Sequence, residues 1–173
     1  EVEWFYQQGA SRLFPEAWEQ YEAAIPEDER HDFLAAYHRR LTSDDEATRL
    51  AAARAWSVWE AATSFLHVDE DFVRGHEDPH FALAFARIEN HYFSNRGFFE
   101  VDGQLLRDVY RMIDIPGVIV HGRYDVVCPV ANAWDLHKAW PKSELVITPA
   151  SGHSAFEPGN VDALVQATDR YAV

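Results

Sequence analysis

The sequence predicts an α/β protein whose first two-thirds are helical and whose last third contains part of a parallel sheet. Proline and acidic residues separate a series of helix-like segments as far as residue 112. From Ile113 the pattern changes to strand, helix, strand and helix, which is typical of parallel-sheet proteins. Two strands alone leave long exposed edges, so we expect residues 113–173 to be the end of a larger sheet.

Proline opens three of the expected helices, where its fixed backbone angle suits the first turn. The segments expected to be helical are PEAWEQYEAA, PEDERHDFLAAYHRRL, ATRLAAARAWSVWEAA, PHFALAFARIENHYF and GQLLRDVYRM. Ser43 and Glu46 have the spacing of a capping box before the third of these. The polar stretch HVDEDFVRGHEDP predicts a loop with at most one short turn of helix.

One expected helix carries a clear apolar face. Phe81, Phe85, Ile88 and Tyr92 recur at steps of three or four residues, as on one side of a helix. In the last third, IPGVIVHG and SELVITP are short apolar runs bounded by turn residues, which predict strands buried on both faces. The helices expected between and after them are ANAWDLHKAW and NVDALVQATDRYA.

The composition restricts the class of protein. With 47% hydrophobic and 14% aromatic residues the chain can fill a core, and its net charge of -14 disfavours nucleic acid as a partner. The single cysteine, Cys128, cannot form an internal disulfide. No apolar run approaches the roughly 20 residues that span a bilayer, and the first residues, EVEWFYQQGA, lack a secretion signal. We therefore expect a cytoplasmic protein that binds neither membrane nor nucleic acid.

An acid and a histidine follow the two predicted strands. Asp125 comes after the run VIV, and His153 lies in the loop SGHSAF that follows the next strand. Because functional groups of parallel sheets gather beyond the carboxyl ends of the strands, we expect these side chains to come within hydrogen-bonding reach. The order Asp then His is that of the last two members of a Ser-His-Asp triad in α/β-hydrolases. The alternative is that Asp125 only caps a helix and that the histidine loop has no catalytic role.

The sequence offers no convincing nucleophile. No serine lies in a G-x-S-x-G turn between a strand and a helix, and Ser151 and Ser154 flank His153 within its own loop. Cys128 follows Asp125 too closely to serve as an independent attacking group, and we interpret it as a pocket-lining or buried thiol. No spacing among the nine histidines indicates a metal site, and no cofactor is expected.

Longer blocks of the sequence resemble a known family. WSVWE, ALAFARIENHYF, IPGVIVHGRYDVVCP, NAWDLHKAWP and GHSAFEPG together are similar to proline iminopeptidases, the prolyl aminopeptidase group of α/β-hydrolases. The resemblance covers the C-terminal part of the family only, because its oxyanion loop and nucleophile turn have no counterpart here. It implies an α/β fold, the C-terminal part of an α/β-hydrolase sheet with an all-helical cap domain. Residues 1–112 would be the cap domain, with an entry linker at 1–10, and residues 113–173 would belong to the catalytic domain.

The resemblance also implies roles for individual residues. Asp125 and His153 would be the triad acid and base. Glu60 and Glu89 would receive the free α-amino group of a peptide that begins with proline, since carboxylates suit a secondary ammonium group. The remaining substrate-binding positions would be Phe93, Tyr92 and Cys128.

The implied activity is that of a serine exopeptidase releasing N-terminal proline, with no metal or cofactor. Its implied partners are such peptides and the N-terminal half of the hydrolase domain, which would carry the nucleophile; without that half the chain would be inactive. Two alternatives stay open at this point. One is an esterase or epoxide hydrolase on the same scaffold, and the other is a non-catalytic helical binding fragment.

Overall fold

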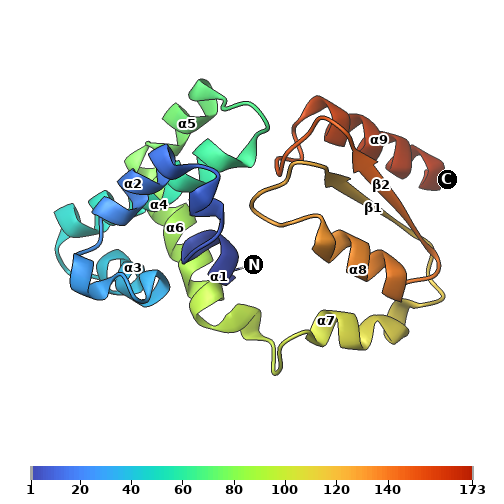
Figure 1. Cartoon of the computed structure of the whole chain (residues 1–173), viewed down its shortest axis with the longest axis horizontal. Coiled ribbons are helices and arrows are strands. Elements are labelled where there is room, and N and C mark those ends of the chain that lie inside the picture. The colour runs from blue at the N-terminus through green and yellow to red at the C-terminus, as the bar shows by residue number, and fades with distance from the viewer. Residues whose placement is uncertain (1, 173) are drawn as a thin grey trace. The chain divides into compact units, whose positions relative to one another are not determined.

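The computed structural model describes residues 2–172, and the chain forms two compact units (Figure 1). The first, called the helical unit below, comprises Glu1–Thr63 and His67–Phe98. The second, called the sheet unit, comprises Ser64–Leu66 and Phe99–Val173. The division into a cap domain at 1–112 and a catalytic domain at 113–173 stays a prediction.

Six α-helices build the helical unit among the described residues. They are α1 (Val2–Tyr6), α2 (Pro15–Ala23), α3 (Phe33–Leu41), α4 (Glu46–Ser64), α5 (Glu70–His76) and α6 (Pro79–Ser94), with the last residue of α4 assigned to the sheet unit. Short 3₁₀ turns lie at Ala10–Arg12, Glu27–Glu29 and Arg96–Phe98. The N-terminal stretch expected to be an entry linker therefore contains a helix, α1.

Aspartate side chains set several helix starts that the sequence reading placed differently. The segment expected to run as one helix from Pro26 breaks, and α3 begins only after Asp32, whose carboxylate accepts the N–H of Ala35 at 2.9 Å. Helix α4 is capped by Asp45, which accepts the N–H of Thr48 at 2.8 Å, and not by the expected Ser43–Glu46 box. A free carboxylate satisfies the unpaired amides of a first turn and favours the positive end of the helix dipole.

The polar stretch expected to be a loop contains two turns of helix. Asp69 accepts the N–H groups of Asp71 and Phe72, both at 3.0 Å, and so starts α5. The same device opens α6, where Asp78 accepts the N–H of Phe81 and Pro79 occupies the first turn as expected. The loop prediction was wrong because capping by Asp69 stabilises α5 in spite of the polar composition of the segment.

Aromatic rings fill the core of the helical unit. Trp56 and Trp59 of α4 are fully buried, and so are Tyr21 of α2 and Tyr37 of α3. Tyr37 stacks on Tyr21 with ring centroids 4.5 Å apart, and its hydroxyl donates to the Tyr21 carbonyl at 2.6 Å. Offset ring pairs of this kind add to the free energy gained from burial alone. The tryptophans of WSVWE are therefore core residues as well as neighbours of Glu60.

Helix α6 does not bury the face that carries its large apolar residues. Its buried residues are Ala82, Ala86 and Asn90, and it packs most extensively on α3. Asn90 joins the two helices, because its amide donates to the Leu34 carbonyl at 3.0 Å and its oxygen accepts from His38 Nδ1 at 2.8 Å. Small side chains allow this close approach. The predicted apolar face is instead largely exposed, with Phe81, Ile88 and Tyr92 between 44% and 61% accessible.

The sheet unit contains two parallel strands, β1 (Gly117–Gly122) and β2 (Ser143–Thr148), in the register Gly117↔Ser143 to Gly122↔Thr148. Helices α8 (Ala131–Ala139) and α9 (Pro158–Tyr171) lie on either side of the strands (Figure 1), and the short helix α7 (Gln104–Arg107) packs on α8. The expected strand–helix–strand–helix order is therefore confirmed. Most strand residues are only partly buried, whereas the sequence predicted burial on both faces.

The core of the helical unit generates a stability prediction. Trp59→Ala should lower the free energy of unfolding by about 3–5 kcal/mol, because it removes a fully buried ring and leaves a cavity. Trp134→Ala, the same change at a half-exposed position of α8, is the control and should cost less than half as much. Urea denaturation of both variants measures the difference, and equal losses would contradict the packing described here.

Candidate functional site

Asp125 is fixed at the end of β1. The chain turns after Gly122, and the Asp125 N–H donates to the Gly122 carbonyl at 3.2 Å. One carboxylate oxygen, Oδ1, accepts the N–H groups of Val127 at 3.0 Å and Cys128 at 2.8 Å. The side chain is only 5% exposed. Backbone amides therefore hold the carboxylate in one orientation.

The other oxygen of Asp125 faces His153. His153 Nδ1 lies 3.0 Å from Asp125 Oδ2, in the loop after β2, as the strand-end argument expected. The two loops are tied by backbone hydrogen bonds from Arg123 N–H to the Thr148 carbonyl at 2.9 Å and from Tyr124 N–H to the Ser151 carbonyl at 3.0 Å. An acid that holds Nδ1 leaves Nε2 as the nitrogen for proton transfer, and the His153 side chain is 38% exposed.

Glycine is required where these loops meet. A Cβ atom at Gly122 would lie 2.0 Å from the carbonyl oxygen of Gly152, a distance that no real contact allows. The close approach brings the end of β1 against the residue that precedes His153. A side chain at Gly122 would force the two loops apart and separate Asp125 from His153.

A second histidine supports the turn. His121 Nε2 donates to the Cys128 carbonyl at 2.8 Å and lies 3.4 Å from Asp125 Oδ2. These contacts give His121 a structural role in the turn. Its ring closes the turn that also carries the backbone donors to Asp125.

Glu157 and Asn160 hold the histidine loop, and the sequence reading missed both. Glu157 is 6% exposed, and its Oε1 accepts the N–H groups of Gly152 at 2.7 Å and Leu66 at 2.9 Å. The amide of Asn160 donates to the Ser154 carbonyl at 2.8 Å. A signal was present in the sequence: both residues stand at the start of α9, directly after the loop.

Cys128 lines a pocket of the sheet unit together with Asp125 and His153. The pocket has a volume of about 210 Å³, and its other walls come from Val120, His121, Gly122, Ala155, Asn160 and Leu164. The thiol is partly buried. This position fits the pocket-lining interpretation of Cys128.

The two predicted amine-binding glutamates lie in the helical unit, each held by an aromatic donor. The Tyr6 hydroxyl donates to Glu60 Oε1, and the Trp56 indole N–H donates to Glu89 Oε2 at 2.9 Å. Tyr6 also stacks on Trp56 with ring centroids 4.4 Å apart, and Phe93 lies 5.1 Å from Tyr6. We call these five residues the carboxylate cluster. Tyr6 and Trp56 were not among the predicted site residues.

Burial and mutual repulsion perturb the cluster. Desolvation of its 6%-exposed side chain, and secondly the charge of Glu89, raise the pKa of Glu60 well above its usual value, although the Tyr6 hydrogen bond opposes the shift. Desolvation, followed by the charges of Glu60 and Glu89, raises the pKa of Tyr6. The phenol therefore stays protonated and keeps donating at any ordinary pH. A buried acid that feels the charge of a second, partly buried acid forms a site suited to a cation.

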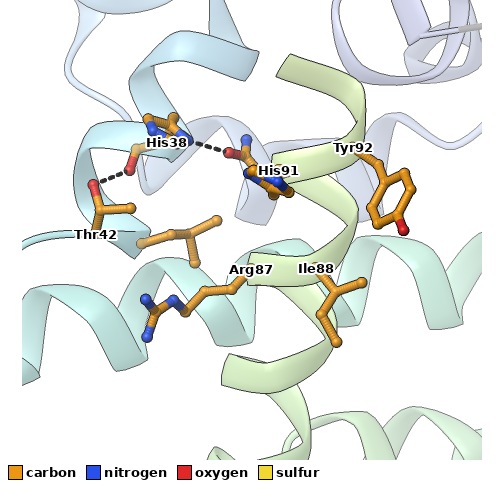
Figure 2. A pocket seen from close by; sticks show the side chains of 8 residues that line it. His38, Thr42, Arg87, Ile88, His91 and Tyr92 are labelled. Atoms are coloured by element: carbon orange, nitrogen blue, oxygen red, sulfur yellow. Dashed lines mark hydrogen bonds between the residues drawn. The ribbon is translucent and has the colours of Figure 1, made fainter. Parts of the chain in front are cut away.

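Tyr92 lies on a different part of α6. Its ring packs against His91 and Phe98, and it borders a pocket of about 280 Å³ between α3 and α6. Figure 2 shows His38 and Thr42 on one side of this pocket and Arg87, Ile88, His91 and Tyr92 of α6 on the other. Phe93 thus packs near Tyr6, the donor to Glu60, and the substrate-binding roles of Phe93 and Tyr92 stay predictions.

Within residues 2–172, no group of three or more His, Cys, Asp or Glu side chains is arranged to hold a metal ion. No helix in the described part of the chain is both long enough and apolar enough to cross a membrane. The cytoplasmic location stays a prediction.

Comparison with known proteins first gives the class. The family model described as TAP-like protein (Abhydrolase_4) matches residues 98–173, the part that contains the parallel strands and the Asp125–His153 pair. Over this part the chain is similar to α/β-hydrolases.

Individual relatives give a narrower similarity. The chain is 79% identical over 172 residues to a proline iminopeptidase of Xanthomonas citri, covering 99% of this chain and 55% of that protein. It is 74% identical to one of Xylella fastidiosa strain Temecula1, with the same coverage, and 52% identical to one of Arabidopsis thaliana, covering 98% of this chain and 45% of that protein. The resemblance to proline iminopeptidases is therefore confirmed. The chain spans about half the length of the curated relatives it matches.

The Glu157 contacts generate a prediction about the histidine loop. Glu157→Ala removes the acceptor of one buried and one partly buried N–H group and should lower the free energy of unfolding by about 1.5–3 kcal/mol, the scale for a hydrogen bond to a charged group. The amide of Gly152 should also exchange faster with deuterium. Glu144→Ala, which removes an exposed partner of Arg170, is the matched control and should cost no more than about 1 kcal/mol. Unchanged Gly152 exchange in the Glu157 variant would contradict the contact.

Proposed function

We propose that these residues belong to a serine-type proline iminopeptidase, an enzyme that releases proline from the N-terminus of peptides. The observation that carries the proposal is the 3.0 Å approach of His153 Nδ1 to Asp125 Oδ2 at the ends of neighbouring parallel strands. That arrangement is the acid–base half of a Ser-His-Asp triad. The names of the relatives support the same activity.

In the proposed reaction His153 Nε2 takes the proton of a serine hydroxyl as the serine oxygen attacks the prolyl carbonyl. The resulting oxyanion collapses, the C–N bond breaks, and the departing amine receives the proton from His153. A water molecule then attacks the prolyl ester with His153 again acting as base, and proline leaves. Asp125 stabilises the imidazolium formed in each half of the reaction and holds the ring in place.

The serine is proposed to come from the N-terminal half of the hydrolase domain. Both serines that flank His153 are buried, and Ser154 accepts the N–H of Phe156, so neither suits attack on a bound peptide. Phe156 is 81% exposed, and Leu105 and Tyr110 of the sheet unit are each 66% exposed. Apolar surface of this extent marks an interface. The N-terminal half is the proposed occupant.

Glu60 and Glu89 are proposed to recognise the free amino end of the substrate. An N-terminal proline carries a secondary ammonium group with two N–H donors, and two carboxylates supply two acceptors. Phe93 and Tyr6 present aromatic surface beside the carboxylates, which suits the apolar pyrrolidine ring. An acylated peptide has no ammonium group and would bring no positive charge to the two acids, so the proposed site selects a free amino end. Cys128, on the pocket beside His153, is a proposed contact of the substrate.

Cleavage of prolyl-naphthylamide tests the acid–base role. In the protein at its natural length, His153→Ala should lower kcat/KM by about 10⁴-fold or more, the scale for a lost triad member. His31→Ala, at an exposed position of the helical unit, is the control and should leave the rate within about twofold. The 173-residue chain alone should show no turnover. Robust cleavage that survives His153→Ala would overturn the proposal.

The glutamates separate a peptidase from an esterase on the same scaffold. Glu60→Gln or Glu89→Gln should lower kcat/KM for prolyl-naphthylamide by about tenfold to a hundredfold, because a charge-assisted hydrogen bond is lost. Hydrolysis of a neutral nitrophenyl ester by the same variants should change little. Equal losses on both substrates would argue against amine recognition, and efficient wild-type cleavage of the ester alone would favour the esterase alternative.

A further inference from the structure

In the carboxylate cluster both glutamates are fixed by aromatic hydrogen-bond donors. Glu60 and Glu89 come from different helices, α4 and α6, and each accepts a hydrogen bond from a different aromatic donor. Trp56 is fully buried and Tyr6 is 4% exposed, so the donors have little freedom to move. The stacking of Tyr6 on Trp56 joins them into one rigid platform.

This platform sets both the position and the proton content of the acids. Two like charges in a buried site repel each other strongly when no cation lies between them. Binding of one proton by the pair relieves this repulsion while the site is empty, as in other coupled carboxylate pairs. A bound cation relieves the repulsion instead, so the proton is released.

We propose that Tyr6 and Trp56 are positioning residues that hold Glu60 and Glu89 as a proton-linked cation site, which releases one proton when a secondary ammonium group binds. The proposal rests on the proposed function and deepens it. It makes capture of the substrate's amino group an exchange of one cation for another. The site thereby keeps its net charge nearly constant in the empty and occupied states.

The titratable groups around Glu60 support this assignment. Three titratable groups interact electrostatically with Glu60, namely Tyr6 of α1, Tyr21 of α2 and Glu89 of α6. Both tyrosines have raised pKa values and remain neutral, with desolvation as the largest cause. Glu60, whose pKa is also raised, is then the group that carries the exchangeable proton.

The sign of the pH dependence follows from linkage. Between the ordinary glutamate pKa and the raised pKa of Glu60, the folded protein binds more protons than the unfolded chain, so its stability falls as pH rises through that window. In contrast to the stability, the affinity of the site for a cation increases as the pH rises, because the proton on Glu60 becomes easier to displace. The affinity levels off at the pH at which Glu60 is already ionised in the empty site.

Calorimetric titration with pyrrolidine hydrochloride tests the exchange. The pyrrolidinium ion keeps its own proton across the neutral range and carries the ring and two N–H donors of a prolyl terminus. Titrations at pH 7 in two buffers of different ionisation enthalpy count the protons released. The protein should be used at its natural length with His153→Ala, so that the triad base cannot supply a proton. We expect a net release of protons on binding, which approaches one per bound cation as the pH is lowered below the raised pKa of Glu60.

Two variants identify the source of the proton and the role of Tyr6. Glu60→Gln should abolish the release and weaken binding by about tenfold or more. Tyr6→Phe keeps the ring but removes the donor to Glu60, so the pH at which release begins to fall should move upward. Tyr37→Phe is the matched control: the residue is equally buried in the same unit, but its hydroxyl donates to the Tyr21 carbonyl. It should leave the pH profile of binding unchanged even if it lowers stability.

The outcomes distinguish this inference from the proposed function. No binding of pyrrolidinium at any pH would overturn the amine site itself and the inference with it. Binding without proton release, or release that persists in Glu60→Gln, would overturn the inference while leaving amine recognition intact. An equal shift of the pH profile in Tyr6→Phe and Tyr37→Phe would show that Tyr6 acts through general stability and not by positioning Glu60.

Discussion

The carboxylate of Asp125 is the interaction on which the candidate active site depends. One oxygen accepts two backbone amides of its own turn, and the other lies 3.0 Å from His153 on the neighbouring loop. A single buried side chain therefore closes the loop after β1 and orients the imidazole after β2. The parallel register of the strands makes this possible, because it brings both loops to the same edge.

The acids of the helical unit follow a different physical rule. Backbone donors hold Asp125, whereas Glu60 accepts from the Tyr6 hydroxyl and feels the charge of Glu89. Desolvation is the largest cause of the raised pKa of Glu60. The first arrangement orients a base, and the second is the one proposed to bind a cation.

The exposed apolar residues agree with the coverage of the relatives. The chain matches about half of each related proline iminopeptidase, and its two strands are only partly buried. The large residues of α6 are exposed in the same way, although their spacing is that of a buried face. The N-terminal half of the hydrolase domain, proposed above as a partner, would cover exposed apolar residues of this kind.

The sequence by itself determined the order of elements, the two strands and the Asp–His pair, because alternation of apolar runs, turn residues and proline is a local signal. It also predicted Glu60, Glu89 and Phe93 as substrate-binding residues, through resemblance to a family. Only the tertiary structure decided which face of α6 is buried, since close packing on α3 selects Ala82, Ala86 and Asn90 over the larger residues. It likewise assigned Glu157 to the histidine loop and Tyr6 to Glu60, which lies 54 positions further along the chain. Those contacts join residues that come together only when the chain folds.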